Sequence, residues 1–76
     1  MLAFVHICTE IGKEEEVAEE LKRLPEVKEI HGALGECDII LKLEGEDLQS
    51  IEKVVMKRIR ALKGITSTKT IITFPV

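Results

Sequence analysis

Aromatic residues are nearly missing from this sequence. It has no tryptophan and no tyrosine, and only Phe4 and Phe74 represent phenylalanine. Proteins that bind nucleic acid usually combine clustered lysine and arginine with aromatic side chains on which bases stack. The chain instead has a formal net charge of −3, and its one basic cluster, residues 57–63, falls at the end of a predicted helix, where the helix dipole favours cations. We therefore expect no direct binding to nucleic acid.

Cysteine and histidine are also scarce. The cysteines, Cys8 and Cys37, form no CxxC pair, and the histidines, His6 and His31, stand at no metal-ligand spacing from them. Neither cysteine has an evident activating base, and the sequence contains no phosphate-binding loop and no paired acid-base motif. We expect no metal site, no cofactor, no catalytic residue and no enzymatic activity.

Long apolar runs are missing as well. No run approaches the ~18 residues of a membrane span, and Met1 leads directly into a predicted strand without a charged leader. We therefore expect a cytoplasmic protein that has no contact with membranes. Asparagine is absent and glutamine occurs once, whereas glutamate and lysine are abundant. This composition is typical of a thermophilic source.

The composition predicts one folded domain over residues 1–76. Hydrophobic residues make up 45% of the chain and charged residues 33%, an apolar content that disordered chains lack. A chain of 76 residues leaves no room for a second core. Because so small a core is often only marginally stable, self-association is an expected source of further stability.

Four segments have the residue types of β-strands, rich in valine, isoleucine and threonine. They are residues 2–9, 27–34, 39–44 and 65–75. Val27 and Ile30 break the strict alternation of the second segment, and Gly32 suggests a β-bulge there.

Two segments have the apolar spacing of amphipathic helices. The first begins after Gly12 with an acidic turn and is stopped by Pro25. The second has Asp47 as a candidate N-cap, and Gly64 is well placed to end it. The order of elements is therefore strand, helix, strand, strand, helix, strand.

An internal repeat supports this order. A shift of 38 positions maps Val17 onto Val55 and Leu21 onto Ile59, each at the same place in its half of the chain. Two such halves with right-handed crossovers interleave as a split βαβ unit. The predicted fold class is α+β, a ferredoxin-like four-stranded antiparallel sheet with both helices on one face.

One face of such a sheet has no cover within the chain. Alternation along the strands places Ala3, Val5 and Ile7 toward the helices, and we expect six other residues to form an apolar patch on the open face. They are Phe4, His6, Cys8, Ile40, Ile72 and Phe74. Burial against a second copy is the simplest remedy, so we predict a dimer packed sheet to sheet. The same alternation points Cys8 outward and Cys37 inward, which disfavours a disulfide.

The turn "GECD", residues 35–38, carries more acid than a turn between strands requires. Two carboxylates, Glu36 and Asp38, stand there around the thiol of Cys37. The turn is a candidate binding site. The alternative is an ordinary solvated turn with no ligand.

The order of elements and three segments together resemble a known family. The segments are "AFVHICTEIGKEEEVAEELKRLPEV", "GECDIILKLEGEDL" and "IRALKGITSTKTIITF", and they cover nearly the whole chain. They look like the RAM (regulation of amino-acid metabolism) domain of the Lrp/AsnC, or leucine-responsive, transcription regulators. In that family an N-terminal helix-turn-helix segment binds DNA. Because residue 3 already belongs to the first RAM-like strand, we expect a stand-alone RAM domain with no helix-turn-helix segment.

The resemblance implies a function for the turn. Family members dimerise, assemble into rings of dimers such as octamers or decamers, and bind small effectors, usually amino acids, between dimers. Gly35 and Asp38 match the two defining positions of the family's G-x-x-D turn, which contributes to the effector site. Glu36 and Cys37 lie within it, and Cys37 stands where the family often has an aromatic residue. Thr66 and Thr68 are further candidates, as hydroxyl donors from a neighbouring dimer.

The resemblance implies an effector-binding and oligomerisation module that modulates full-length Lrp/AsnC regulators by co-assembly. Two alternatives remain open. One is a purely structural co-assembly module without a ligand. The other is a small ferredoxin-like monooxygenase that uses His6 or His31, which would need a cleft on the open sheet face.

Overall fold

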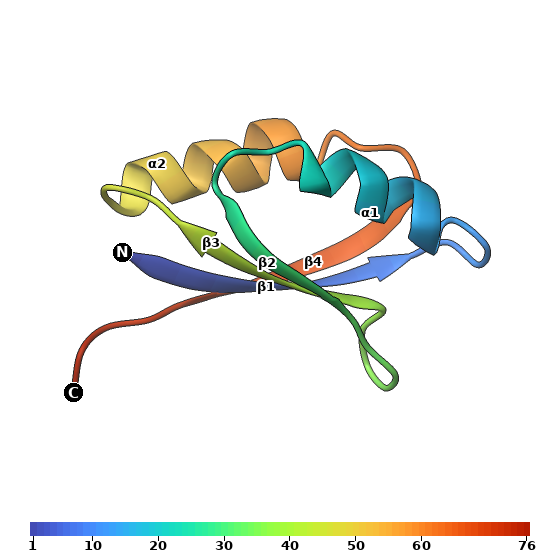
Figure 1. Cartoon of the computed structure of the whole chain (residues 1–76), viewed down its shortest axis with the longest axis horizontal. Helices are drawn as coiled ribbons and strands as arrows, with labels where there is room; N and C mark the ends of the chain where they lie inside the picture. The colour runs from blue at the N-terminus through green and yellow to red at the C-terminus, as the bar shows by residue number, and fades with distance from the viewer.

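In the computed structural model, which describes residues 1–76, the elements follow one another in the predicted order. They are β1 (Leu2–Thr9), α1 (Glu14–Lys22), β2 (Val27–Gly32), β3 (Ile39–Glu44), α2 (Leu48–Lys53), η1 (Val54–Ile59) and β4 (Ile65–Ile72). The strands form one antiparallel sheet in the order β2-β3-β1-β4, and the helices form a second layer on one face of it (Figure 1). This is the ferredoxin-like arrangement, so the predicted fold class is confirmed.

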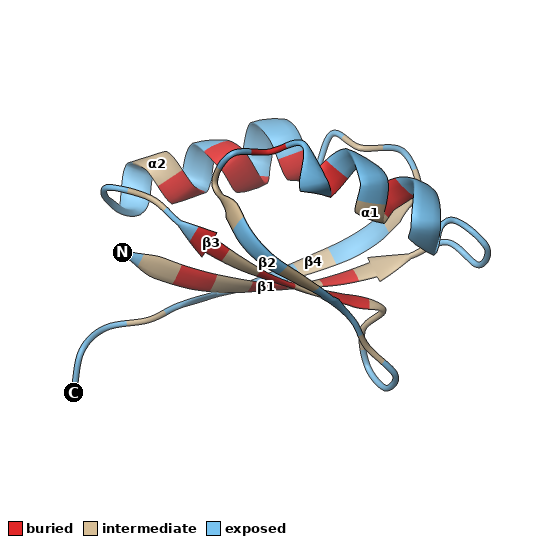
Figure 2. Ribbon diagram, in the orientation of Figure 1, coloured by how far each residue is buried: buried red, intermediate tan, exposed pale blue.

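The core lies between the two layers. Ala3, Val5 and Ile7 of β1 are each 0% exposed, as the alternation along this strand predicted. Leu41 and Leu43 of β3 are equally buried beside them. Figure 2 shows the buried residues alternating along the strands and lining the undersides of the helices. The sheet thus buries one face within the chain and leaves the other open.

The irregularity in β2 lies at Lys28, not at Gly32 as the sequence suggested. Val27 pairs with Leu43 and Glu29 pairs with Lys42, so the register shifts between Val27 and Glu29. The extra residue lets Val27 and Ile30, three positions apart, both pack against the core. The broken alternation therefore indicated a real bulge, but placed it at the glycine. β2 also ends at Gly32, two residues earlier than expected.

The start of the second helical region agrees with its predicted signal, whereas its end comes earlier than expected. Asp47 is the N-cap of α2, and its Oδ1 accepts a hydrogen bond of 2.8 Å from the backbone N–H of Ser50. η1 ends at Ile59 with Arg60 as its C-cap, so Gly64, which was expected to end the helix, lies instead in the connection to β4. Its φ of +93° is a left-handed conformation that favours glycine. None of the helices is long and apolar enough to span a membrane.

The second predicted helix is not regular throughout, because α2 continues into the π-helical segment η1. The backbone N–H of Arg60 donates to the carbonyl of Val55, five residues back, at 2.9 Å. In a regular α-helix Arg58 would return to the buried face of Ile51, since residues seven apart share a face. The wider turns leave Arg58 exposed and keep Ile59 fully buried. The π segment thus keeps a charged side chain out of the core.

The register of β4 corrects one residue of the predicted open-face patch. Ile72 pairs with Ala3, which faces the helices, and lines a hollow with residues of α2. Ile71 pairs with Phe4 and takes the open-face position instead. The error arose because a register shift between Cys8 and Thr9 changes the alternation of β4 relative to β1.

The rest of the open face combines apolar and charged residues, with Lys69 of β4 beside His6 and further charges toward β2. Phe4, His6, Cys8 and Ile40 lie on it, and all four are partly buried. Phe74 lies beyond β4 in the C-terminal tail, where it is 78% exposed, so it is not part of the sheet. On the β2 side the ammonium of Lys42 contacts the carboxylate of Glu29 at 3.1 Å. That this face is a dimer interface stays a prediction.

Candidate functional site

The turn between β2 and β3 is held in place by backbone hydrogen bonds at its base. The N–H of Ala33 donates to the carbonyl of Asp38 at 2.8 Å, and the N–H of Asp38 donates to the carbonyl of Ile7 at 2.9 Å. Within the turn Gly35 has a φ of +137°, which a residue with a side chain rarely adopts. The glycine at this position is therefore required by the backbone itself.

Side chains fasten the turn to the end of β1. Oδ2 of Asp38 accepts hydrogen bonds from the backbone N–H of Thr9 at 2.8 Å and from its hydroxyl at 3.4 Å. The thiol of Cys8 donates to the carbonyl of Glu36 at 3.1 Å. Asp38 is therefore partly engaged within the chain, a role that the sequence did not predict. Its second oxygen, Oδ1, makes no such contact.

The four predicted residues of the turn differ in accessibility. Gly35 and Glu36 are exposed, whereas Cys37 and Asp38 are partly buried. Both Cys8 and Cys37 are free thiols. The turn therefore presents one exposed carboxylate and one that is oriented by the end of β1.

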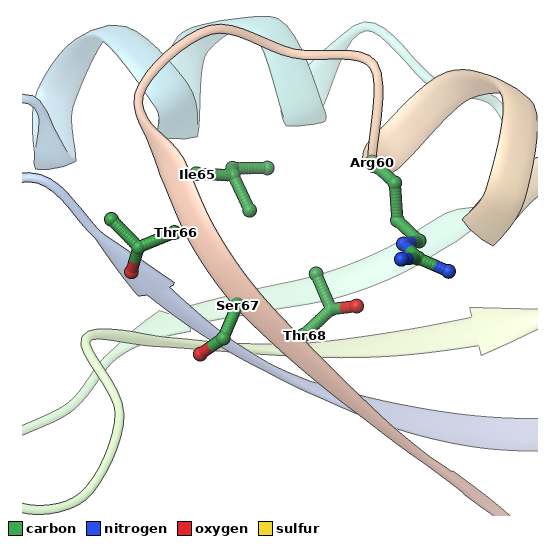
Figure 3. A pocket seen from close by; sticks show the side chains of 5 residues that line it. All are labelled: Arg60, Ile65, Thr66, Ser67 and Thr68. Atoms are coloured by element: carbon green, nitrogen blue, oxygen red, sulfur yellow. The ribbon is translucent and has the colours of Figure 1, made fainter.

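Thr66 and Thr68 line a hollow of about 410 Å³ at the start of β4. Arg60, just after η1, and Ile65 and Ser67 complete its lining. In Figure 3 the side chain of Thr68 extends to the side of β4 on which Arg60 lies, whereas Thr66 and Ser67 extend from the other side. From the sequence, Arg60 was explained only as one of the cations that a helix dipole favours. No pattern of neighbouring residues indicated that the end of η1 would lie beside β4.

The turn and the hollow do not meet in one chain. Thr9 binds Asp38 on one side and pairs with Ile65 on the other, so the end of β1 lies between them. The hollow does not include any residue from 35 to 38. Both features nevertheless lie at the same end of the sheet.

The two histidines lie on the open face, on β1 and β2. Nε2 of His31 contacts Oε1 of Glu29 at 3.1 Å, on the exposed β2 edge. Hydrogen bonds from His31 and then from Lys42 hold the pKa of Glu29 below its ordinary value of 4.5. His6 lies in the middle of the sheet between Ile40 and Lys69. Both histidines therefore belong to the open sheet surface.

Comparison with known families and sequences gives a consistent result. Residues 2–75 match the family described as the Lrp/AsnC ligand binding domain. An uncharacterised HTH-type transcriptional regulator of Pyrococcus furiosus is 36% identical over 61 residues, which are 80% of this chain and 41% of the regulator. The chain thus spans less than half the length of this relative.

Solved structures share the fold over nearly the whole chain. The crystal structure of FFRP-DM1 has a TM-score of 0.92 and 38% identity, and the match covers 96% of this chain and 97% of that one. A transcriptional regulator of Neisseria meningitidis, solved as a complex with L-methionine, has a TM-score of 0.88 at 20% identity. That match covers 97% of this chain and 49% of the regulator.

Proposed function

Because the chain belongs to the Lrp/AsnC ligand-binding domain family, we propose that it is a non-enzymatic module that binds an amino acid between dimers. The residues in contact with the ligand are those of the turn, from Gly35 to Asp38, together with Thr66 and Thr68 of a neighbouring dimer. The L-methionine complex of the Neisseria regulator, which shares the fold, supports an amino acid as the class of ligand.

The observation that carries this proposal is the state of Asp38. Its Oδ2 is held by the backbone N–H of Thr9, which orients the carboxylate and leaves Oδ1 for a ligand. A fixed carboxylate binds an α-ammonium group through a charge-assisted hydrogen bond without a further loss of side-chain freedom. The exposed Glu36 adds negative charge beside it. The turn is therefore suited to the cationic end of an amino acid.

Isothermal titration with the twenty amino acids tests the proposal. We expect at least one to bind, and Asp38→Asn to weaken its binding about tenfold or more, because the amide keeps an acceptor for Thr9 but loses the charge. Glu46→Gln is the matched control, since Glu46 is an exposed acid in the β3–α2 connection. Silence across all twenty amino acids, or equal binding by the Asp38→Asn variant, would contradict the proposal.

The open sheet face supports the proposed dimer. Phe4, Ile40 and Ile71 lie on it, and the first two are only partly buried within the chain while Ile71 is exposed. Apolar area buried against a second copy contributes about 25 cal/mol per Å², so a few hundred Å² yield several kcal/mol before the entropy of association is subtracted. Dimers of this kind then assemble into rings, with the turns and the β4 hollows at the contacts between dimers.

We place the module in transcription regulation through its relatives. The Pyrococcus relative is an HTH-type transcriptional regulator, and this chain matches 41% of its length. A shared sheet face allows the chain to assemble with full-length regulators and to change their assembly in response to the amino acid. Size-exclusion chromatography of the chain mixed with such a regulator, with and without amino acid, tests this role.

A second candidate function is supported by the same carboxylate. Asp38 already accepts a hydrogen bond from Thr9, so its role can be purely structural, to hold the turn against the end of β1. The chain is then a co-assembly module without a ligand. This alternative predicts the same mixed assembly with a regulator, unchanged by any amino acid. The titration and the chromatography together separate the two functions.

A further inference from the structure

Arg60 is the one cation that lines the hollow at the start of β4. The hollow is bounded by Arg60 at the end of the helical layer and by residues 65–68 of the strand, and no acidic side chain lines it. Arg60 takes part in none of the ion pairs of the chain, which involve Lys13, Lys22, Arg23, His31 and Lys42. Its guanidinium is therefore free to bind a ligand.

Three of the other four residues that line the hollow carry hydroxyl groups, which can donate hydrogen bonds. Thr68 extends toward the side of Arg60, whereas Thr66 and Ser67, which also line the hollow, extend from the other side of β4 (Figure 3). β4 is an edge strand, so alternate backbone N–H groups along it point away from the sheet. A planar guanidinium fork beside hydroxyl and N–H donors matches the geometry of a carboxylate.

The helix dipole alone does not account for Arg60. Lys57 and Arg58 belong to the same last turn and satisfy the dipole equally well. Neither of them lines this hollow. The chain continues from Arg60 through a short connection into β4, and of these three cations only Arg60 lines the hollow. Arg58 is thus a natural control for the charge of this region.

We propose that Arg60 and the hydroxyl of Thr68 bind the α-carboxylate of the amino acid whose ammonium group binds the turn of another chain. The inference rests on the proposed function and adds the anionic half of the site. It explains why the acidic turn and the basic hollow lie at the same end of the sheet yet do not meet in one chain. An amino acid carries both charges, so it is complementary to two chains and to neither alone.

The test compares charge variants of the assembled protein. For any amino acid that binds the wild type, Arg60→Gln is expected to weaken binding about tenfold or more, because a charge-assisted bidentate contact is lost. Arg60→Lys retains the charge but not the planar guanidinium, so its affinity should lie between those of the wild type and Arg60→Gln. Arg58→Gln, the matched control, should leave the affinity unchanged. The amine that lacks the carboxylate should bind wild type and Arg60→Gln equally.

A second measurement does not depend on an amino acid. Titration with sodium acetate, followed by the NMR signal of the Arg60 Nε–H group, should give a saturable shift that is not seen for Arg58. If an amino acid binds but Arg60→Gln has no effect, the proposed function stands and the carboxylate site is wrong. If no amino acid binds, the proposed function fails, and the acetate titration alone tests the anion site. A saturable shift of the Arg60 signal supports that site, and the absence of a shift overturns it.

Discussion

The carboxylate of Asp38 accepts a hydrogen bond of 2.8 Å from the backbone N–H of Thr9, 29 residues away in the sequence. This contact joins the turn between β2 and β3 to the end of β1. The thiol of Cys8 reaches the carbonyl of Glu36 in the same place. One carboxylate thus holds the turn and, in the proposed function, presents its remaining oxygen to a ligand.

Removal of this acceptor should destabilise the fold. Asp38→Ala leaves the partly buried N–H of Thr9 without its partner, and we expect a loss of about 1–2 kcal/mol in the free energy of unfolding. Asp38→Asn should lose less, since an amide oxygen still accepts the bond. Urea unfolding followed by circular dichroism measures both. Equal losses for the two variants would show that the bond to Thr9 is not what stabilises the turn.

Three glycine positions should respond differently to alanine. At Gly35 the φ of +137° is strained for alanine but a Cβ meets no atom within 4 Å, so we expect a loss of about 1–3 kcal/mol. At Gly64 the same type of strain is joined by contacts of 3.1 Å to Lys13 Cβ and Val17 Cγ2, so the loss should be larger. Gly32 has neither feature and should tolerate alanine. Thermal unfolding of the three variants gives the order, and a Gly32→Ala loss equal to the others would contradict it.

Neighbouring isoleucines of β4 should have opposite effects on the proposed dimer. Ile71 pairs with Phe4 on the open face, whereas Ile72 pairs with Ala3 on the helix face. Ile71→Asp places a charge in the proposed interface and should shift the protein toward monomer, because an unpaired buried charge is costly. Ile72→Asp should leave the dimer intact. Sedimentation velocity at several concentrations compares them, and a wild type that remains monomeric would refute the dimer.

The cap of α2 predicts a dependence of stability on pH. Hydrogen bonds from Ser50 hold the pKa of Asp47 below its ordinary value of 3.8. A lowered pKa in the folded state means that the cap contributes its stability above pH 3.8 and loses it as the pH falls through the folded value. The difference in stability between wild type and Asp47→Ala should therefore shrink in acid. Asp47→Asn caps without titrating, so its advantage over Asp47→Ala should persist at low pH.

The division of the proposed site between two chains can be tested by mixing variants. Asp38→Asn and Arg60→Gln should each bind the amino acid weakly alone. If each site takes Asp38 from one chain and Arg60 from another, random co-assembly of equal amounts restores about a quarter of the sites to the wild-type pair. Titration of the co-refolded mixture should show this fraction at wild-type affinity. If the mixture binds no better than its components, the two-chain site is wrong. Asp38 and Arg60 then either act within the same chain or do not both contact the ligand.

Several features of the fold follow from local patterns in the sequence. The alternation of apolar residues in β1 and β3 predicted which side chains are buried, because successive side chains of a strand point to opposite faces whatever the strand packs against. Asp47 marked the start of the second helical region, because an N-cap binds a backbone N–H only a few positions along the chain. The turn itself was recognisable from Gly35 and Asp38.

Other features depend on contacts between elements that are distant in the sequence. The bulge at Lys28, the exchange of Ile71 for Ile72 on the open face and the π-helical turns before Arg60 each arise where one element must fit the register of another. The bond from Thr9 to Asp38 and the hollow beside Arg60 are of the same kind. The sequence alone therefore determined the layers, the elements and the acidic turn, since these follow from local periodicity. The tertiary structure decided what surrounds that turn and where Arg60 lies, because only packing sets the distances between residues far apart along the chain.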